Sequence, residues 1–101
     1  MIISYIICKD KDEAKRISKV LINKKLAACC NIIQTESLYH WKNKLVEDTE
    51  VILLAKTLDK NFPEIKKEVL KIHSYKIPCI LKINVKDINA SYLNWLKSRV
   101  K

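Results

Sequence analysis

The stretch from Ala28 to Thr57, ACCNIIQTESLYHWKNKLVEDTEVILLAKT, is rich in Ile, Val, Leu, Tyr and Trp and is interrupted by the polar residues Lys42, Asn43 and Lys44. Two β-branched and aromatic runs around a short polar break predict two strands joined by a turn. The break lacks the Asn-Gly pair typical of a tight two-residue turn, so the strands are better defined than their connection. We therefore expect a long hairpin here.

A strand and a helix are expected before the hairpin. Ile2 to Cys8 is apolar and β-branched, as in a buried strand. Asp10, followed three residues later by Glu13, is a typical helix start, and an apolar stripe then continues at helical spacing to about Lys25. The first half of the chain thus predicts strand, helix and hairpin.

A second helix, a strand and a short helix are expected after the hairpin. Asn61 and Pro63 mark a helix start, because proline is tolerated in the first turn. Pro78 favours an extended chain into a strand over CILKINV, residues 79–85, and Asn89 is suited to cap a final helix.

The predicted order is βαββαβ with a C-terminal helix, which indicates an α+β, ferredoxin-like fold with an antiparallel sheet carrying two helices on one face. Residues 1–101 suit a single domain. Both faces of the hairpin are partly apolar, so we expect a second copy of the chain to cover the face without helices.

The composition argues against nucleic-acid binding and against catalysis. The net charge is +9, but the excess is mostly lysine in a chain without glycine, which indicates compositional bias more than a nucleic-acid site. RNA-recognition modules display aromatic residues on central strands, whereas the first strand carries only Tyr5. Without glycine there is no phosphate-binding loop. We expect neither nucleic acid as a partner nor catalysis.

The chain has no apolar run near the roughly 20 residues of a membrane span, and its first residues do not resemble a secretory leader. Its four cysteines include no C-x-x-C pair. Reduced thiols in the cytoplasm and no membrane partner are therefore expected.

Three residues are candidate metal ligands. In a ferredoxin-like sheet the last strand runs antiparallel to the first and beside it, so Cys8 and Cys79 should lie at the same end. The second helix finishes there too, which brings His73 near both thiols. Two sulfurs and an imidazole suit a soft or borderline ion such as copper(I) or zinc. The alternative is a small buried thiol with a histidine at a helix end.

Several motifs together resemble the CutA family of divalent-cation tolerance proteins: SLYHWKNKLVEDTEVILLAKT (residues 37–57), KLAAC (25–29) and HSYKIPCILKINVKDINASYLNWL (73–96). The resemblance spans nearly the whole chain. It implies a homotrimer shaped like PII signalling proteins, association with copper or other divalent ions, and copper contacts at Cys8 and His73. It also leaves open a PII-like role in sensing a small ligand.

This chain departs from the family pattern at four positions. Ser74 replaces a proline, Cys79 a glutamate, Asn43 the hairpin glycine and Ile72 a histidine. Loss of that histidine removes a ligand, which Cys79 could replace only if it faces the same way as Cys8.

Cys29 and Cys30 are adjacent on a predicted strand and so point to opposite faces. They also lie at the opposite end of the sheet from Cys8. We interpret Cys29 as a small buried residue and Cys30 as a substitute for a β-branched neighbour, both structural.

Overall fold

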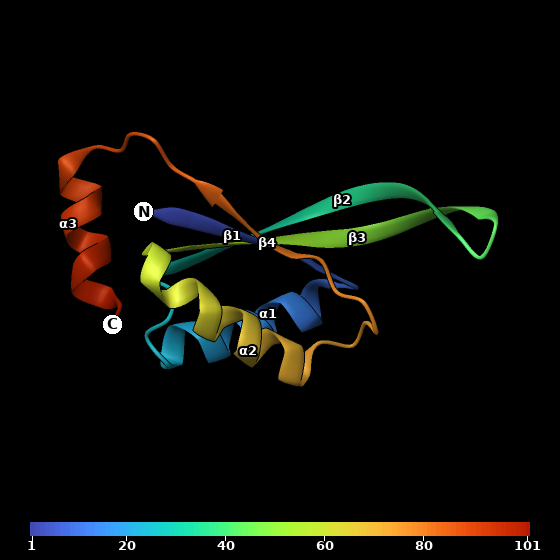
Figure 1. The fold of residues 1–101 in the computed structure, drawn as a ribbon, viewed down its shortest axis with the longest axis horizontal. Helices are drawn as coiled ribbons and strands as arrows, with labels where there is room; N and C mark the ends of the chain where they lie inside the picture. Colours follow the sequence, from blue (N-terminus) through green and yellow to red (C-terminus); the bar gives the residue numbers. More distant parts are fainter.

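The computed structural model describes all 101 residues and confirms the predicted order of elements (Figure 1). These are β1 (Ile2–Cys8), α1 (Lys11–Asn23), β2 (Cys29–Trp41), β3 (Lys44–Thr57), the 3₁₀ turn η1 (Asp59–Asn61), α2 (Phe62–Ile72), β4 (Ile80–Asn84) and α3 (Ala90–Arg99).

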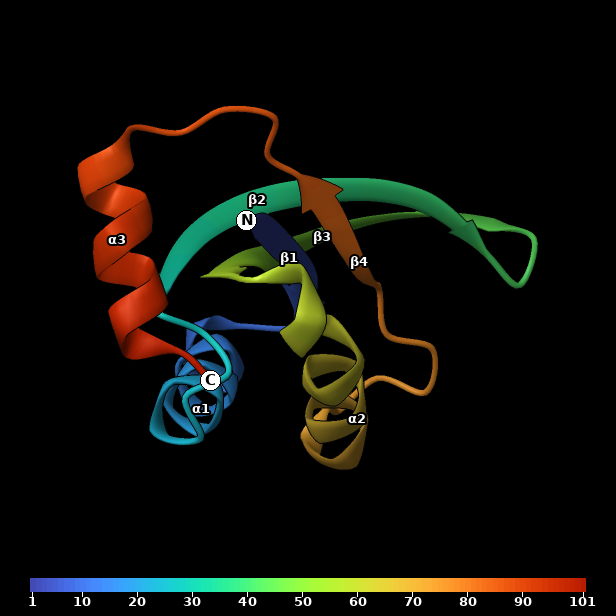
Figure 2. The same ribbon diagram turned by 60° about the vertical axis from the view of Figure 1, so that its left-hand side comes forward.

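The four strands form one antiparallel sheet in the order β2-β3-β1-β4. Helices α1 and α2 lie on one face of this sheet, and α3 stands at one end of it (Figures 1 and 2). The β2–β3 hairpin extends well beyond the other strands at the opposite end. This is the predicted ferredoxin-like α+β fold.

Helix α1 starts where its sequence predicts. The side chain of Asp10 accepts a hydrogen bond of 2.8 Å from the backbone N–H of Glu13, which satisfies one of the free donors of the first turn. Ala14, Ile17 and Leu21 then point into the core and are fully buried. Burial of this stripe holds α1 against the sheet.

The hairpin turns on two residues without glycine. Lys42 and Asn43 have φ values of 51° and 64°, so both occupy the left-handed region. Trp41 pairs directly with Lys44, which makes this a two-residue connection. Positive φ at both central positions is the pattern of a type I′ turn, and asparagine tolerates it better than other non-glycine residues.

Strand register decides which cysteine of the adjacent pair faces the core. Cys30 lies opposite the buried Ala55 and packs against the hydrophobic core, whereas Cys29 lies opposite Lys56 on the other face. Burial raises the pKa of the Cys30 thiol to about 11. The prediction that Cys29 is the buried member was therefore wrong, although the two thiols do face opposite ways.

The face of the sheet away from α1 and α2 exposes apolar side chains. Tyr5 of β1 pairs with Leu81 of β4, and Ile3 pairs with Ile83; Leu81 and Ile83 are more than 40% exposed. On the core side, Val51 of β3 shares the buried face with Leu53. None of the helices combines the length and apolarity needed to cross a membrane.

Candidate functional site

Cys8 is the last residue of β1, and its side chain points to the helix-covered face, where it is fully buried. Burial, together with the nearby carboxylates of Glu13 and Asp10, raises the pKa of its thiol to about 12, although Arg16 acts in the opposite direction. A free Cys8 is therefore a neutral thiol at physiological pH.

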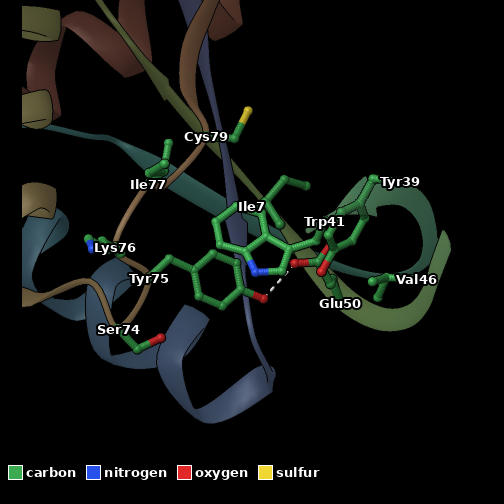
Figure 3. Close-up of a pocket in the computed structure, with 10 residues that line it drawn as sticks. All are labelled: Ile7, Tyr39, Trp41, Val46, Glu50, Ser74, Tyr75, Lys76, Ile77 and Cys79. Carbon is green, nitrogen blue, oxygen red and sulfur yellow. Dashed lines mark hydrogen bonds between the residues drawn. The ribbon is translucent and has the colours of Figure 1, made fainter. Parts of the chain in front are cut away.

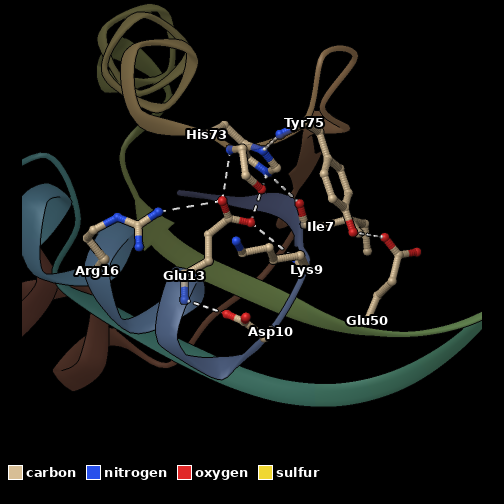
Figure 4. Close-up of polar contacts among 9 residues, drawn as sticks. Ile7, Lys9, Asp10, Glu13, Arg16, Glu50, His73 and Tyr75 are labelled. Carbon is tan, nitrogen blue, oxygen red and sulfur yellow. Dashed lines mark hydrogen bonds and ion pairs between the residues drawn. The ribbon is translucent and has the colours of Figure 1, made fainter.

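His73 follows α2 directly, and its imidazole is buried beneath the following loop (Figure 4). Its Nδ1 accepts a hydrogen bond of 3.0 Å from the backbone N–H of Tyr75. The ring proton must then lie on Nε2, which is 2.7 Å from the carbonyl oxygen of Ile7 and donates to it. His73 thus ties the end of α2 to β1.

Glu13 completes the cluster from the first turn of α1, and its side chain is fully buried. Its carboxylate accepts hydrogen bonds from the backbone N–H groups of Lys9 (2.9 Å) and Ser74 (2.8 Å). Arg16 lies 3.6 Å away, and Nε2 of His73 lies 4.0 Å away. Burial alone would raise the pKa of Glu13, but these donors outweigh it and hold the pKa below its usual range.

Cys8, Glu13 and His73 bring one sulfur, one oxygen and one nitrogen within 4.8 Å of one another. This donor set fits a borderline ion such as zinc or copper. Each group already has a proton or a protein partner, so an ion has to displace the thiol proton of Cys8 and a hydrogen bond of His73. An ion that binds this cluster would therefore compete with protons.

Cys79 does not belong to this cluster. It lies at the same end of the sheet as Cys8, as predicted, but directly beside Ile7. The backbone N–H of Ile7 donates a hydrogen bond of 3.2 Å to the carbonyl oxygen of Cys79. Neighbouring strand residues point to opposite faces, so Cys79 shares the face of Ile7 and not that of Cys8. The structure therefore joins Cys8 to His73 and separates Cys79 from both.

Cys79 instead lines a pocket of about 680 Å³ on the other face, between the hairpin and the segment that follows His73 (Figure 3). Tyr39 and Trp41 of β2 form part of its wall. Inside it, the hydroxyl of Tyr75 donates a hydrogen bond of 2.5 Å to Glu50. Tyr75 thus stands in the pocket while its backbone contacts His73 of the cluster formed by Cys8, Glu13 and His73.

Sequence reasoning overlooked two of these groups. Glu13 was interpreted only as a helix-start signal, although its position just after the strand that ends in Cys8 also places it beside that thiol. Glu50 ends the polar run that begins at Glu47, just before the apolar half of β3, and yet it is only 5% exposed. Its position in the sequence predicts a solvated carboxylate, so no local signal indicated its burial.

Comparison with known proteins gives consistent matches. The model of the family described as CutA1 divalent ion tolerance protein matches residues 2–99. The divalent-cation tolerance protein CutA of Pyrococcus horikoshii is 36% identical over 101 residues, which cover 100% of this chain and 99% of that protein.

Solved structures agree. The crystal structure of CutA1 from P. horikoshii has a TM-score of 0.96 at 35% identity and covers 100% of this chain and 99% of its own. The structure of the periplasmic divalent cation tolerance protein CutA from Archaeoglobus fulgidus has a TM-score of 0.96 at 37% identity and covers 100% of both chains.

Proposed function

The chain belongs to the CutA1 divalent ion tolerance family, and from this premise we propose that it is a homotrimer that binds copper or another divalent ion in metal tolerance. Its role is binding and not catalysis. The observation that carries the metal assignment is the convergence of Cys8, Glu13 and His73 within 4.8 Å.

The metal proposal is tested by titrating the intact protein with copper(I), and separately with zinc, against a competing chelator. Cys8→Ala should weaken binding at least about tenfold, because a thiolate is the strongest ligand of the set. The matched control is Cys30→Ala, which removes another thiol of raised pKa at the far end of the sheet. Equal affinity in these two variants would exclude the site.

The pH dependence provides a second readout. Since the pKa of Cys8 is raised to about 12, each bound ion has to release a proton from this thiol at neutral pH. Affinity should therefore increase with pH, and the increase should be lost in Cys8→Ala.

The trimer is supported by the apolar sheet face that α1 and α2 leave uncovered, formed by residues such as Ile3, Tyr5, Leu81 and Ile83. Exposed apolar surface of this extent favours a partner subunit. Sedimentation should give a mass three times that of the 11.8 kDa chain. A stable monomer at micromolar concentration would contradict the assembly.

We also propose a cytoplasmic location. All four cysteines are unpaired, which is typical of a reducing compartment. Cell fractionation tests this proposal, and recovery from the periplasm or the medium would contradict it.

A second candidate function is PII-like sensing of a small ligand. The pocket beside Tyr75 supports it, because a volume of about 680 Å³ lies in the range of small-molecule sites. Tyr75 lines this pocket, and its backbone N–H donates a hydrogen bond to His73. The pocket therefore adjoins the cluster formed by Cys8, Glu13 and His73.

A further inference from the structure

The pocket between the hairpin and the Ser74–Cys79 segment contains a carboxylate with spare bonding capacity. Glu50 is only 5% exposed, and its Oε2 accepts the hydrogen bond from the Tyr75 hydroxyl. Its other oxygen, Oε1, accepts no hydrogen bond from the protein. Glu50 lines the pocket, so one oxygen of a nearly buried carboxylate is available to a ligand there (Figure 3).

Aromatic side chains surround this carboxylate. Tyr39, Trp41 and Tyr75 all line the pocket, with Trp41 and Tyr75 on one side of Glu50 and Tyr39 on the other (Figure 3). Aromatic faces attract cations, most strongly where water is partly excluded. A carboxylate among aromatic rings is therefore matched to a positively charged group with N–H donors.

The pocket lining carries one carboxylate, Glu50, and one ammonium group, Lys76, in a protein whose net charge is +9. Burial, followed by the carboxylates of Asp48 and Glu50, raises the pKa of Tyr39, and burial and Glu50 also raise that of Cys79. Lys76 lines the pocket as well, but it takes part in none of the ion pairs. It lies across the pocket from Glu50, on the far side of Tyr75 (Figure 3).

We propose that this pocket binds a small organic cation, a primary ammonium or amidinium group carried on an apolar or aromatic body. The cationic group donates to Oε1 of Glu50, and the body packs against Trp41 and Ile7. This assignment rests on the second candidate function, the small-ligand pocket, and names its ligand class. Ile7 shares its sheet face with Ile3 and Tyr5, so the assignment requires that the subunits of the proposed trimer leave the pocket open.

Three probes of similar shape test the assignment by calorimetry on the intact protein: 2-phenylethylamine, which is cationic at neutral pH, neutral 2-phenylethanol and anionic phenylacetate. The amine should bind at least about tenfold more tightly than the alcohol, since hydrogen bonds to charged groups are the stronger ones. Phenylacetate should bind most weakly. The net charge of +9 acting alone favours the reverse order.

The variant Glu50→Gln removes the charge but keeps an oxygen that can accept from Tyr75. It should lose at least about tenfold in affinity for the amine and little for the alcohol. The matched control, Glu47→Gln, makes the same change at an exposed position of the same strand outside the pocket. It should bind the amine like the unaltered protein.

Trp41→Leu provides a second variant whose fold should be undisturbed, because Trp41 is 48% exposed. This substitution should weaken binding of the amine more than binding of the alcohol, since it removes the cation–π contribution. Equal effects of Glu50→Gln and Glu47→Gln, or a preference for phenylacetate, would overturn the cation assignment and leave a small-ligand pocket. If none of the probes binds, as when a neighbouring subunit fills the pocket, both the cation assignment and the small-ligand function are overturned. The metal proposal is unaffected by that result.

Discussion

Replacing Glu13 by glutamine tests the buried cluster most directly. The carboxylate accepts two backbone N–H groups, those of Lys9 and Ser74, with different oxygens. Glutamine offers one carbonyl oxygen, so its NH₂ group would face the other N–H. A partly buried donor left unpaired costs about 1–3 kcal/mol. Loss of the half-exposed Arg16 ion pair adds less than about 1 kcal/mol.

The expected loss is thus about 1–4 kcal/mol in the free energy of unfolding. Urea denaturation followed by circular dichroism measures it, at one fixed protein concentration because the stability of an oligomer depends on concentration. Asp12→Asn is the control: it is exposed in the same helical turn and loses the same helix-dipole interaction, worth about 0.3–1 kcal/mol.

Acid should remove the difference between Glu13→Gln and the unaltered protein. The folded-state pKa of Glu13 lies below the ordinary value of 4.5, so its charge stabilises the fold fully above that value. This stabilisation is lost as the pH falls through the folded-state pKa, because a protonated Glu13 resembles glutamine. The reasoning is refuted if Glu13→Gln costs no more than Asp12→Asn, or if the difference persists throughout the acid range.

Three further predictions concern the turn, the thiols and the surface charge. Asn43→Gly should raise the free energy of unfolding by about 0.5–1 kcal/mol in the same urea assay, because glycine accepts the φ of 64° without steric cost; a loss of stability would contradict the two-residue turn. Cys8 should resist iodoacetamide in the folded protein and react after denaturation, since it is buried and its thiol has a pKa of about 12; mass spectrometry that finds Cys8 modified as fast as the exposed Cys79 would count against this. Binding of single-stranded DNA, measured by fluorescence anisotropy, should disappear at near-physiological salt, whereas a defined stoichiometry there would indicate a specific site.

The sequence alone determined the order and type of the elements, because local signals specify them. Apolar runs rich in β-branched and aromatic residues predicted the strands, Asp10 and Pro63 marked the helix starts, and the polar break at Lys42 marked the turn of the hairpin. The same signals placed Cys8 and His73 at one end of the sheet, and the structure confirms this placement.

Only the tertiary structure decided which way the candidate ligands face. Cys79 points away from Cys8, Cys30 and not Cys29 faces the core, and Glu13 joins the cluster through a loop 61 residues further along the chain. The physical reason is register: shifting a strand by one residue moves every side chain to the other face. Register depends on how distant segments of the chain pair with one another. The residue type at a single position does not encode that pairing.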